Sequence, residues 1–463
     1  MDFLITLSAL FLLMFVAYRG FSVILFAPIA AMLAVFVTDP SSVPTIFTSV
    51  FMERMVGFVK LYFPVFLLGA IFGKVIELSG FSKAIVAAII GLVGKQRAIL
   101  SIVLVCAVLT YGGVSLFVAV FAVYPFAAEM FRQSGIPKRL IPGTIALGAF
   151  SFTMDALPGT PQIQNIIPTT FFGTTTWAAP VLGLVGGAFI LATGLAWLEW
   201  RRRQAAQEGE GYGAYHINEP EPVKVEALVA TAIAILPLIV VFAANRALTL
   251  AIPALYGPKH TAQLAGMAAP ATADVAALTA IWAVQGALIL GILTVFAFAF
   301  RPVAAKFAEG SRAAVSGALL ASMNTAAEYG FGAVIAALPG FLVIRDALAH
   351  ISNPLLNEAV TVSTLAGITG SASGGLSIAL AAMAKQFIAA AEAAHIPMEV
   401  LHRVAAMASG GMDTLPHNGA VITVLAVTGL THRVAYKDIF AVTVLKTAAV
   451  FVVIGFYYLT GLY

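Results

Sequence analysis

Long apolar runs recur along the whole chain, and they are its dominant pattern. Two clear examples are residues 226–243 and 438–457. A helix needs roughly 20 mostly apolar residues to cross a bilayer, because its backbone polar groups must be satisfied within the segment. Ten-residue segments of alternating polarity, which mark membrane-spanning strands, are absent. The pattern therefore predicts an all-α polytopic membrane protein.

Composition supports this prediction. Of 463 residues, 61% are hydrophobic and 10% are charged, whereas soluble globular chains carry about 25% charged residues. Residues 3–17 follow no basic region and precede no small-residue cleavage site, so we expect a retained first helix rather than a removed signal peptide. The single cysteine, Cys106, excludes an intramolecular disulfide. No basic patch interleaved with aromatics indicates a nucleic-acid partner.

The chain contains an internal repeat. Four motifs recur in the same order at offsets of 258 to 262 residues: 72–76 with 331–335, 112–115 with 374–377, 136–137 with 396–397, and 154–158 with 412–416. We therefore divide the chain into a first transmembrane repeat (1–200), a linker (201–225) and a second transmembrane repeat (226–463). Such repeats, with a site near the bilayer midplane, are typical of secondary transporters.

Charge in the connections indicates that the two repeats have inverted topology. Three consecutive arginines at 201–203 open the polar linker, which places the linker in the cytoplasm. The connection 301–315 is basic, whereas the matching connection 39–54 is not. This alternation predicts an N-terminus outside, a linker inside and a C-terminus outside. A re-entrant hairpin in each half completes the predicted topology.

Motifs of other function classes are absent. The chain has no phosphate-binding G-x-x-x-x-G-K-[ST] loop, no His/Cys/carboxylate cluster with metal-ligand spacing, and no G-x-S-x-G nucleophile motif. We therefore expect no enzyme, no cofactor and no nucleotide-driven pump.

One pair of interruptions in the apolar segments is rich in glycine and serine. Its members are Gly112, Gly113 and Ser115 in the first half and Ser371, Ser373, Gly374, Gly375 and Ser377 in the second. Paired glycines allow unusual backbone angles, and the helix that follows would begin with free N–H groups. Such a helix start binds anions, and serines add hydroxyl donors. The alternative is close helix packing through small residues.

A second pair of interruptions combines acids, prolines and amides. The candidate residues are Asp155, Thr160, Gln162 and Asn165 in the first half and Asp413, His417 and Asn418 in the second. Prolines break a helix here, and non-helical backbone at membrane depth is tolerated where it lines a cavity or is buried in protein. Intramembrane acids are usually functional, so Asp155 and Asp413 are candidates for ion coupling. Their alternative role is to brace the broken helix ends.

Glu328 is an acid without a counterpart, because Gly69 occupies the equivalent position of the first half. An acid that breaks the repeat symmetry suits a proton-coupling role, and its alternative is to pair with a nearby polar group. We find no lysine or arginine placed at the midplane. The substrate anion would then be held by helix N-termini and hydroxyls, which also leaves a neutral polyol open.

The repeat, the broken-helix segments 155–165 and 413–419, and the Gly/Ser motifs resemble the gluconate:proton symporter (gluconate permease) family of the ion transporter superfamily. Within it, residues 17–28 look closest to 3-hydroxybutyrate permeases. The resemblance implies a proton-coupled importer of small hydroxycarboxylates in the bacterial inner membrane. It also implies hairpin tips at 112–115 and 371–377 that meet at the substrate, and it makes a homodimer plausible.

Three alternatives stay open at this stage. Superfamily relatives use sodium, and carbonyl, Asn and Ser oxygens would suit it, but the titratable residues favour protons. Two acids in corresponding positions also occur in intramembrane aspartyl proteases, although the Gly/Pro/Ser-rich breaks fit a solute cavity better. A channel would show flux that is not tied to a second ion.

Overall fold

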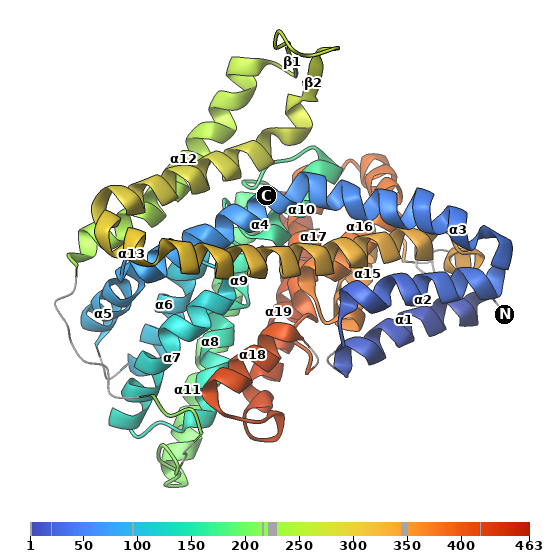
Figure 1. Ribbon diagram of the computed structural model, residues 1–463. Helices are drawn as coiled ribbons and strands as arrows, with labels where there is room; N and C mark the ends of the chain where they lie inside the picture. The colour runs from blue at the N-terminus through green and yellow to red at the C-terminus, as the bar shows by residue number, and fades with distance from the viewer. Residues whose placement is uncertain are drawn as a thin grey trace.

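The computed structural model describes residues 2–19, 21–94, 97–214, 217–220, 229–343, 351–416 and 418–463. Figure 1 shows a helical molecule. The first repeat contains α1 (Asp2–Tyr18), α2 (Val23–Thr38), η1 (Pro40–Ser42), α3 (Val43–Ile46), the π-helical η2 (Phe47–Met52), α4 (Glu53–Leu78), α5 (Phe81–Val93), α6 (Ala98–Tyr111), α7 (Leu116–Gln133), η4 (Lys138–Leu140), α8 (Ile141–Ala149), α9 (Phe152–Asp155), α10 (Ile163–Phe172) and α11 (Pro180–Gln207).

The second repeat is also helical apart from one short hairpin. It contains α12 (Thr231–Tyr256), β1 (Lys259–Ala262), β2 (Ala271–Asp274), α13 (Val275–Ala337), α15 (Pro354–Thr369), α16 (Ala372–Ala393), α17 (Met398–Gly411), α18 (Gly419–Thr428) and α19 (His432–Thr460). The antiparallel pair β1–β2, which the sequence analysis did not predict, joins α12 to α13. Helix α13 is kinked at Ala299, whose backbone is not helical.

Several helices are suited to cross a membrane. Within the described residues, six are long and apolar enough: the continuous helix 40–78, α11, α12, α13, α16 and α19. Large apolar side chains such as Phe11, Phe298 and Phe451 lie on the outer surface. An apolar exterior of this kind is expected of a protein whose surroundings are lipid. The chain is an all-α polytopic membrane protein, as predicted.

The order of the elements repeats, and equivalent helices run in opposite directions. Helix α4 is equivalent to the second part of α13, and the two lie side by side across the middle of the molecule (Figure 1). Late in α13, Gly330 faces Phe51 of η2, which directly precedes α4. Earlier in α13, Gly310 faces Leu78 at the end of α4, so the two helices are antiparallel. Equivalent helices of an inverted repeat must be antiparallel.

The equivalent helices α11 and α19 give the same result. Gly186, early in α11, faces Val453, late in α19, while Trp197 donates to Asp438 (3.1 Å) near the start of α19. A second antiparallel pair is therefore built from corresponding helices. The structure agrees with the inverted arrangement that the charge pattern indicates.

The linker is fastened to the first repeat by ion pairs. Helix α11 continues to Gln207, so the irregular part of the linker begins later than residue 201. Glu219 pairs with Lys138 (2.5 Å) and with Arg132. Burial alone would raise the pKa of Glu219, but the hydrogen bonds from these two cations outweigh it and lower the pKa below its usual value.

Candidate functional site

A cavity of about 950 Å³ lies where the two helical hairpins and the two chain breaks converge. Its polar lining from the first repeat includes Gly113, Ser115, Gln162 and Gln164; from the second repeat it includes Asn324, Thr325, Glu328, Ser371, Ser373, Asp413 and Asn418. Thus eight of the predicted site residues line one cavity: Gly113, Ser115, Gln162, Glu328, Ser371, Ser373, Asp413 and Asn418. Segments far apart in the sequence meet there because the repeats are inverted.

The first hairpin tip joins α6 to α7. Gly113 adopts a φ of +98°, which is strained for residues with a side chain, so the turn requires glycine here. Ser115 is the N-cap of α7, but its side chain makes no capping hydrogen bond. The first N–H groups of α7 therefore have no side-chain cap, and Ser115 and Leu116 at this helix start line the cavity, which suits an anion site.

The second tip joins α15 to α16 and is more tightly capped. Gly370 ends α15 with a φ of +64°. Ser371 is the N-cap of α16, and its hydroxyl accepts a hydrogen bond from the Gly374 N–H (3.0 Å). Ser373 lies 3.2 Å from the Thr325 hydroxyl on α13. At this tip the available donors are hydroxyl groups rather than uncapped backbone N–H groups.

In each repeat, an amide side chain ties the chain break to the neighbouring tip. Gln162, the N-cap of α10, donates to the Thr110 carbonyl (2.7 Å). Asn418, the N-cap of α18, donates to the Gly370 carbonyl (2.7 Å). The cavity therefore has a matched polar clamp in each half. Movement of a tip would be transmitted directly to the adjacent break.

The remaining glycines of the two tip motifs provide close packing. A side chain at Gly112 would overlap Leu238 on α12, and one at Gly375 would overlap the backbone of Ala366. A side chain at Gly374 would overlap the Glu328 carboxylate. These glycines lie behind the cavity wall, and so does Ser377, which is fully buried. The small-residue alternative therefore describes Gly112, Gly374 and Gly375 better than unusual backbone angles do.

Glu328 is the acid that faces the second tip. It is 3% exposed, lines the cavity and has the Ser371 hydroxyl as its polar neighbour. Its Oε2 atom makes no hydrogen bond. A buried charged carboxylate without a partner is costly. The site can lower that cost by binding a proton or a cation there.

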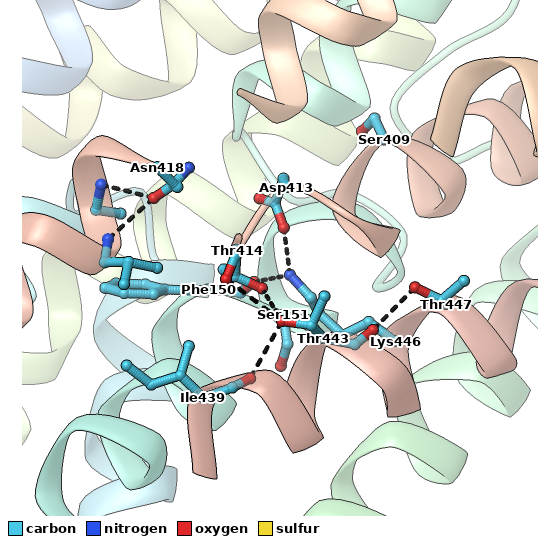
Figure 2. A network of polar contacts seen from close by, with 12 residues as sticks. Phe150, Ser151, Ser409, Asp413, Thr414, Asn418, Ile439, Thr443, Lys446 and Thr447 are labelled. Atoms are coloured by element: carbon cyan, nitrogen blue, oxygen red, sulfur yellow. Dashed lines mark hydrogen bonds and ion pairs between the residues drawn. The ribbon is translucent and has the colours of Figure 1, made fainter. Parts of the chain in front are cut away.

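The break in the second repeat contains a buried ion pair (Figure 2). The Lys446 ammonium on α19 lies 2.5 Å from Asp413 Oδ1 and donates to the Phe150 carbonyl (2.9 Å). Lys446 is 1% exposed. The adjacent Thr414 and Thr443 hydroxyls are 2.7 Å apart. Asp413 therefore has a cationic partner on the side away from the cavity.

The break in the first repeat is held by a buried arginine from the second. The Arg403 guanidinium on α17 donates to the carbonyls of Asp155 (2.8 Å) and Ala178 (2.8 Å) and to Asn165 Oδ1 (3.0 Å). Asn165 in turn donates to the Thr160 carbonyl (3.0 Å). Asn165 and Thr160 thus brace the broken chain behind the cavity wall.

The Asp155 side chain is also buried, but it is arranged differently from Asp413. Its carboxylate lies against Gly410 on α17, where any larger residue would overlap it. Lys446, Asp413 and Arg403 are the charged groups that act on it. The two acids of the repeat therefore share one charged cluster, with the lysine paired to Asp413.

Two buried cations bear on the expectation that no lysine or arginine is placed at the midplane. Lys446 and Arg403 are both almost fully buried beside the breaks. Lys446 could have been found from its sequence, because it is an isolated charge in the apolar run 438–457. Arg403 could not, because its neighbourhood is polar and resembles a connection. His417 lies outside the described residues.

Comparison with known proteins agrees with the fold. The chain is 59% identical over 471 residues to the protein named uncharacterized transporter YxjC of Bacillus subtilis (strain 168), with both chains covered completely. The crystal structure of the Alcanivorax borkumensis YdaH transporter, described as having an unusual topology, matches with a TM-score of 0.53 over 91% of this chain and 90% of that one. At 14% identity, this second match shows the fold alone. No family model matches the chain.

Proposed function

The chain belongs to the transporter family of YxjC, and we propose that it is a proton-coupled symporter that imports a small hydroxycarboxylate, of the 3-hydroxybutyrate or gluconate type, across the bacterial inner membrane. The observation that carries the proposal is the shared cavity. Both hairpin tips, both breaks and Glu328, whose Oε2 atom makes no hydrogen bond, line it. Secondary transporters built from inverted repeats bind their substrates at such a repeat interface.

The cavity offers groups that match the substrate class. The open start of α7 at Ser115 would bind a carboxylate, and Ser371 and Ser373 would bind hydroxyl groups. Apolar side chains such as Val65 and Ile163 supply a surface for a short alkyl chain. A volume of about 950 Å³ leaves room for a small acid together with water. The resemblance of residues 17–28 to 3-hydroxybutyrate permeases supports the same class.

Glu328 is the acid best suited to carry the coupled proton. It faces the cavity, it is buried, and one of its oxygens has no hydrogen-bond partner. The one cation among the described cavity-lining residues, Lys74, is paired with Glu77 (2.7 Å). A proton would therefore neutralise Glu328 when the cavity is closed to water. Asp155 and Asp413 complete the proposed ion-coupling group.

The proposal is tested by uptake of labelled 3-hydroxybutyrate and gluconate into proteoliposomes. Each acid is supplied with an inward proton gradient, an inward sodium gradient, or neither. We expect accumulation with the proton gradient alone. Accumulation that requires sodium would overturn the proton assignment, and saturable uptake of neither acid would overturn the substrate class. Flux without accumulation would indicate a channel.

The Glu328→Gln variant tests the coupling residue. It keeps the size of the side chain but cannot release a proton, so we expect proton-driven accumulation to be lost. Exchange of labelled for unlabelled substrate should persist, because exchange needs no net proton movement. Glu77→Gln is the matched control, since Glu77 also lines the cavity but is half exposed. Normal accumulation by Glu328→Gln would exclude this residue as the proton carrier.

A further inference from the structure

The Lys446 ammonium lies where two interrupted helices end. Phe150, whose carbonyl it contacts at 2.9 Å, is the C-cap of α8. Asp413, whose carboxylate it contacts at 2.5 Å, follows the C-cap of α17. The C-terminal end of a helix carries a partial negative charge. The two helix ends and the carboxylate therefore all make the electrostatic potential at the ammonium negative.

Oxygens of this kind coordinate sodium ions in transporters with broken helices. Half-helix C-terminal ends and unwound backbone carbonyls coordinate sodium in such proteins. Phe150 and Asp413 both line the cavity, whereas Lys446 does not. The ammonium thus occupies a cation position one layer behind the cavity wall. It reaches that position on its own side chain rather than by binding from solution.

This cation is present in one repeat only. Asp155 and Asp413 are 258 residues apart, and helices α11 and α19 begin 252 residues apart, so the position equivalent to Lys446 lies within residues 188–194, which contain no lysine. The first repeat therefore has the acid without the lysine, and Asp155 packs against Gly410 instead. A lysine required merely to hold a broken helix would be expected in both halves. Its presence in one half points to a specific charge requirement.

We propose that the Lys446 ammonium is a tethered cation that takes the place of a coupling sodium ion. This inference rests on the proposed function, since it presupposes an ion-coupled transporter. Transport by the wild-type protein would then be independent of sodium. Removal of the lysine side chain beyond Cβ would leave the oxygens of Asp413 and Phe150 free to bind sodium from solution.

The first test is the thermal unfolding of purified protein in sodium, potassium or choline chloride at equal ionic strength. Wild-type protein should unfold at the same temperature in all three salts. The Lys446→Ala variant should gain a saturable, sodium-specific rise of roughly 2 °C or more in its midpoint. The isosteric Lys446→Met variant should gain none, because its side chain still fills the space.

A double variant identifies the sodium ligand. Adding Asp413→Asn to Lys446→Ala should abolish the sodium-specific rise, because the carboxylate is the only charged ligand that the proposal assigns. Sodium-specific stabilisation of the wild type would overturn the proposal, and so would a folded Lys446→Ala variant that does not respond to sodium. If Lys446→Ala does not fold, a sodium-specific rise in the wild-type midpoint would still overturn the proposal. None of these measurements depends on the transported acid. An error in the proposed substrate can therefore be distinguished from an error in the proposed role of Lys446.

Discussion

Gly374 offers a direct test of whether the position of the Glu328 carboxylate matters for transport. The glycine lies in the first turn of α16, and a methyl group added there would point at the carboxylate and overlap it. Alanine is otherwise well suited to a helix and would favour it by about 1 kcal/mol relative to glycine. The substitution Gly374→Ala therefore displaces one functional group while it leaves the helix intact.

The size of the displacement follows from the packing. Real Cβ contacts essentially never fall below 3.0 Å. The carboxylate would have to withdraw by about 1 Å to restore that separation, and in enzymes a displacement of this size can reduce activity about 100-fold. Glu328 can withdraw because its Oε2 atom has no hydrogen bond to break. We expect at least a tenfold loss of proton-driven uptake with little change in stability.

The assay compares three glycine variants by initial uptake rate and by midpoint of thermal unfolding. Gly317→Ala is the matched control, because Gly317 also lines the cavity but has open space around its Cβ position. Gly375→Ala should instead destabilise the protein, since its methyl group would overlap the rigid backbone of Ala366. Wild-type uptake by a stable Gly374→Ala variant would refute the reasoning, because the carboxylate would then tolerate displacement.

Three further predictions concern stability and the linker. Lys446→Met should cost about 3–5 kcal/mol by leaving a buried carboxylate unpaired, and addition of Asp413→Asn should restore most of the loss in the midpoint of thermal unfolding. Arg403→Lys should destabilise the protein by about 1–3 kcal/mol for each acceptor left without a donor, whereas Arg202→Lys on the exposed end of α11 should not; equal midpoints for the two would contradict the bracing role. The lowered pKa of Glu219 means that docking of the linker is fully present above the ordinary carboxyl value of about 4.3 and is lost as the pH falls through the lowered value. Limited proteolysis of the linker should therefore accelerate in acid, and Glu219→Gln should remove this pH dependence.

The sequence was sufficient to predict the features that depend on local patterns. Glycine and proline interrupt apolar runs at 112–115 and 155–165, and the structure places a helix-to-helix turn and a broken helix there. The repeat was detectable because the same interruptions recur in the second half. Eight of the named candidate residues line one cavity because these interruptions are where the chain turns inside the protein.

The side-chain partners could not be predicted, because they join distant parts of the chain. Lys446 meets the Phe150 carbonyl across 296 residues, and Arg403 meets the Asp155 carbonyl across 248 residues. No local pattern specifies such a contact; it depends on how the two repeats pack. The same limit explains Gly374, whose role depends on the position of Glu328 on another helix. The sequence of a glycine-rich motif does not show whether a given glycine is needed for a turn or for close packing against another side chain.

The charged groups at the site break a symmetry that the backbone keeps. In transporters built from inverted halves, the scaffold has two related conformations that open toward opposite sides of the membrane. Identical side chains in both halves would make those conformations nearly equal in energy. Glu328 and Lys446 occur in the second half alone; Gly69 and the uncharged segment 188–194 take their places in the first half. In the proposed symporter, protonation of this single acid would shift the equilibrium between the two conformations, by as much as the affinity for the proton differs between them.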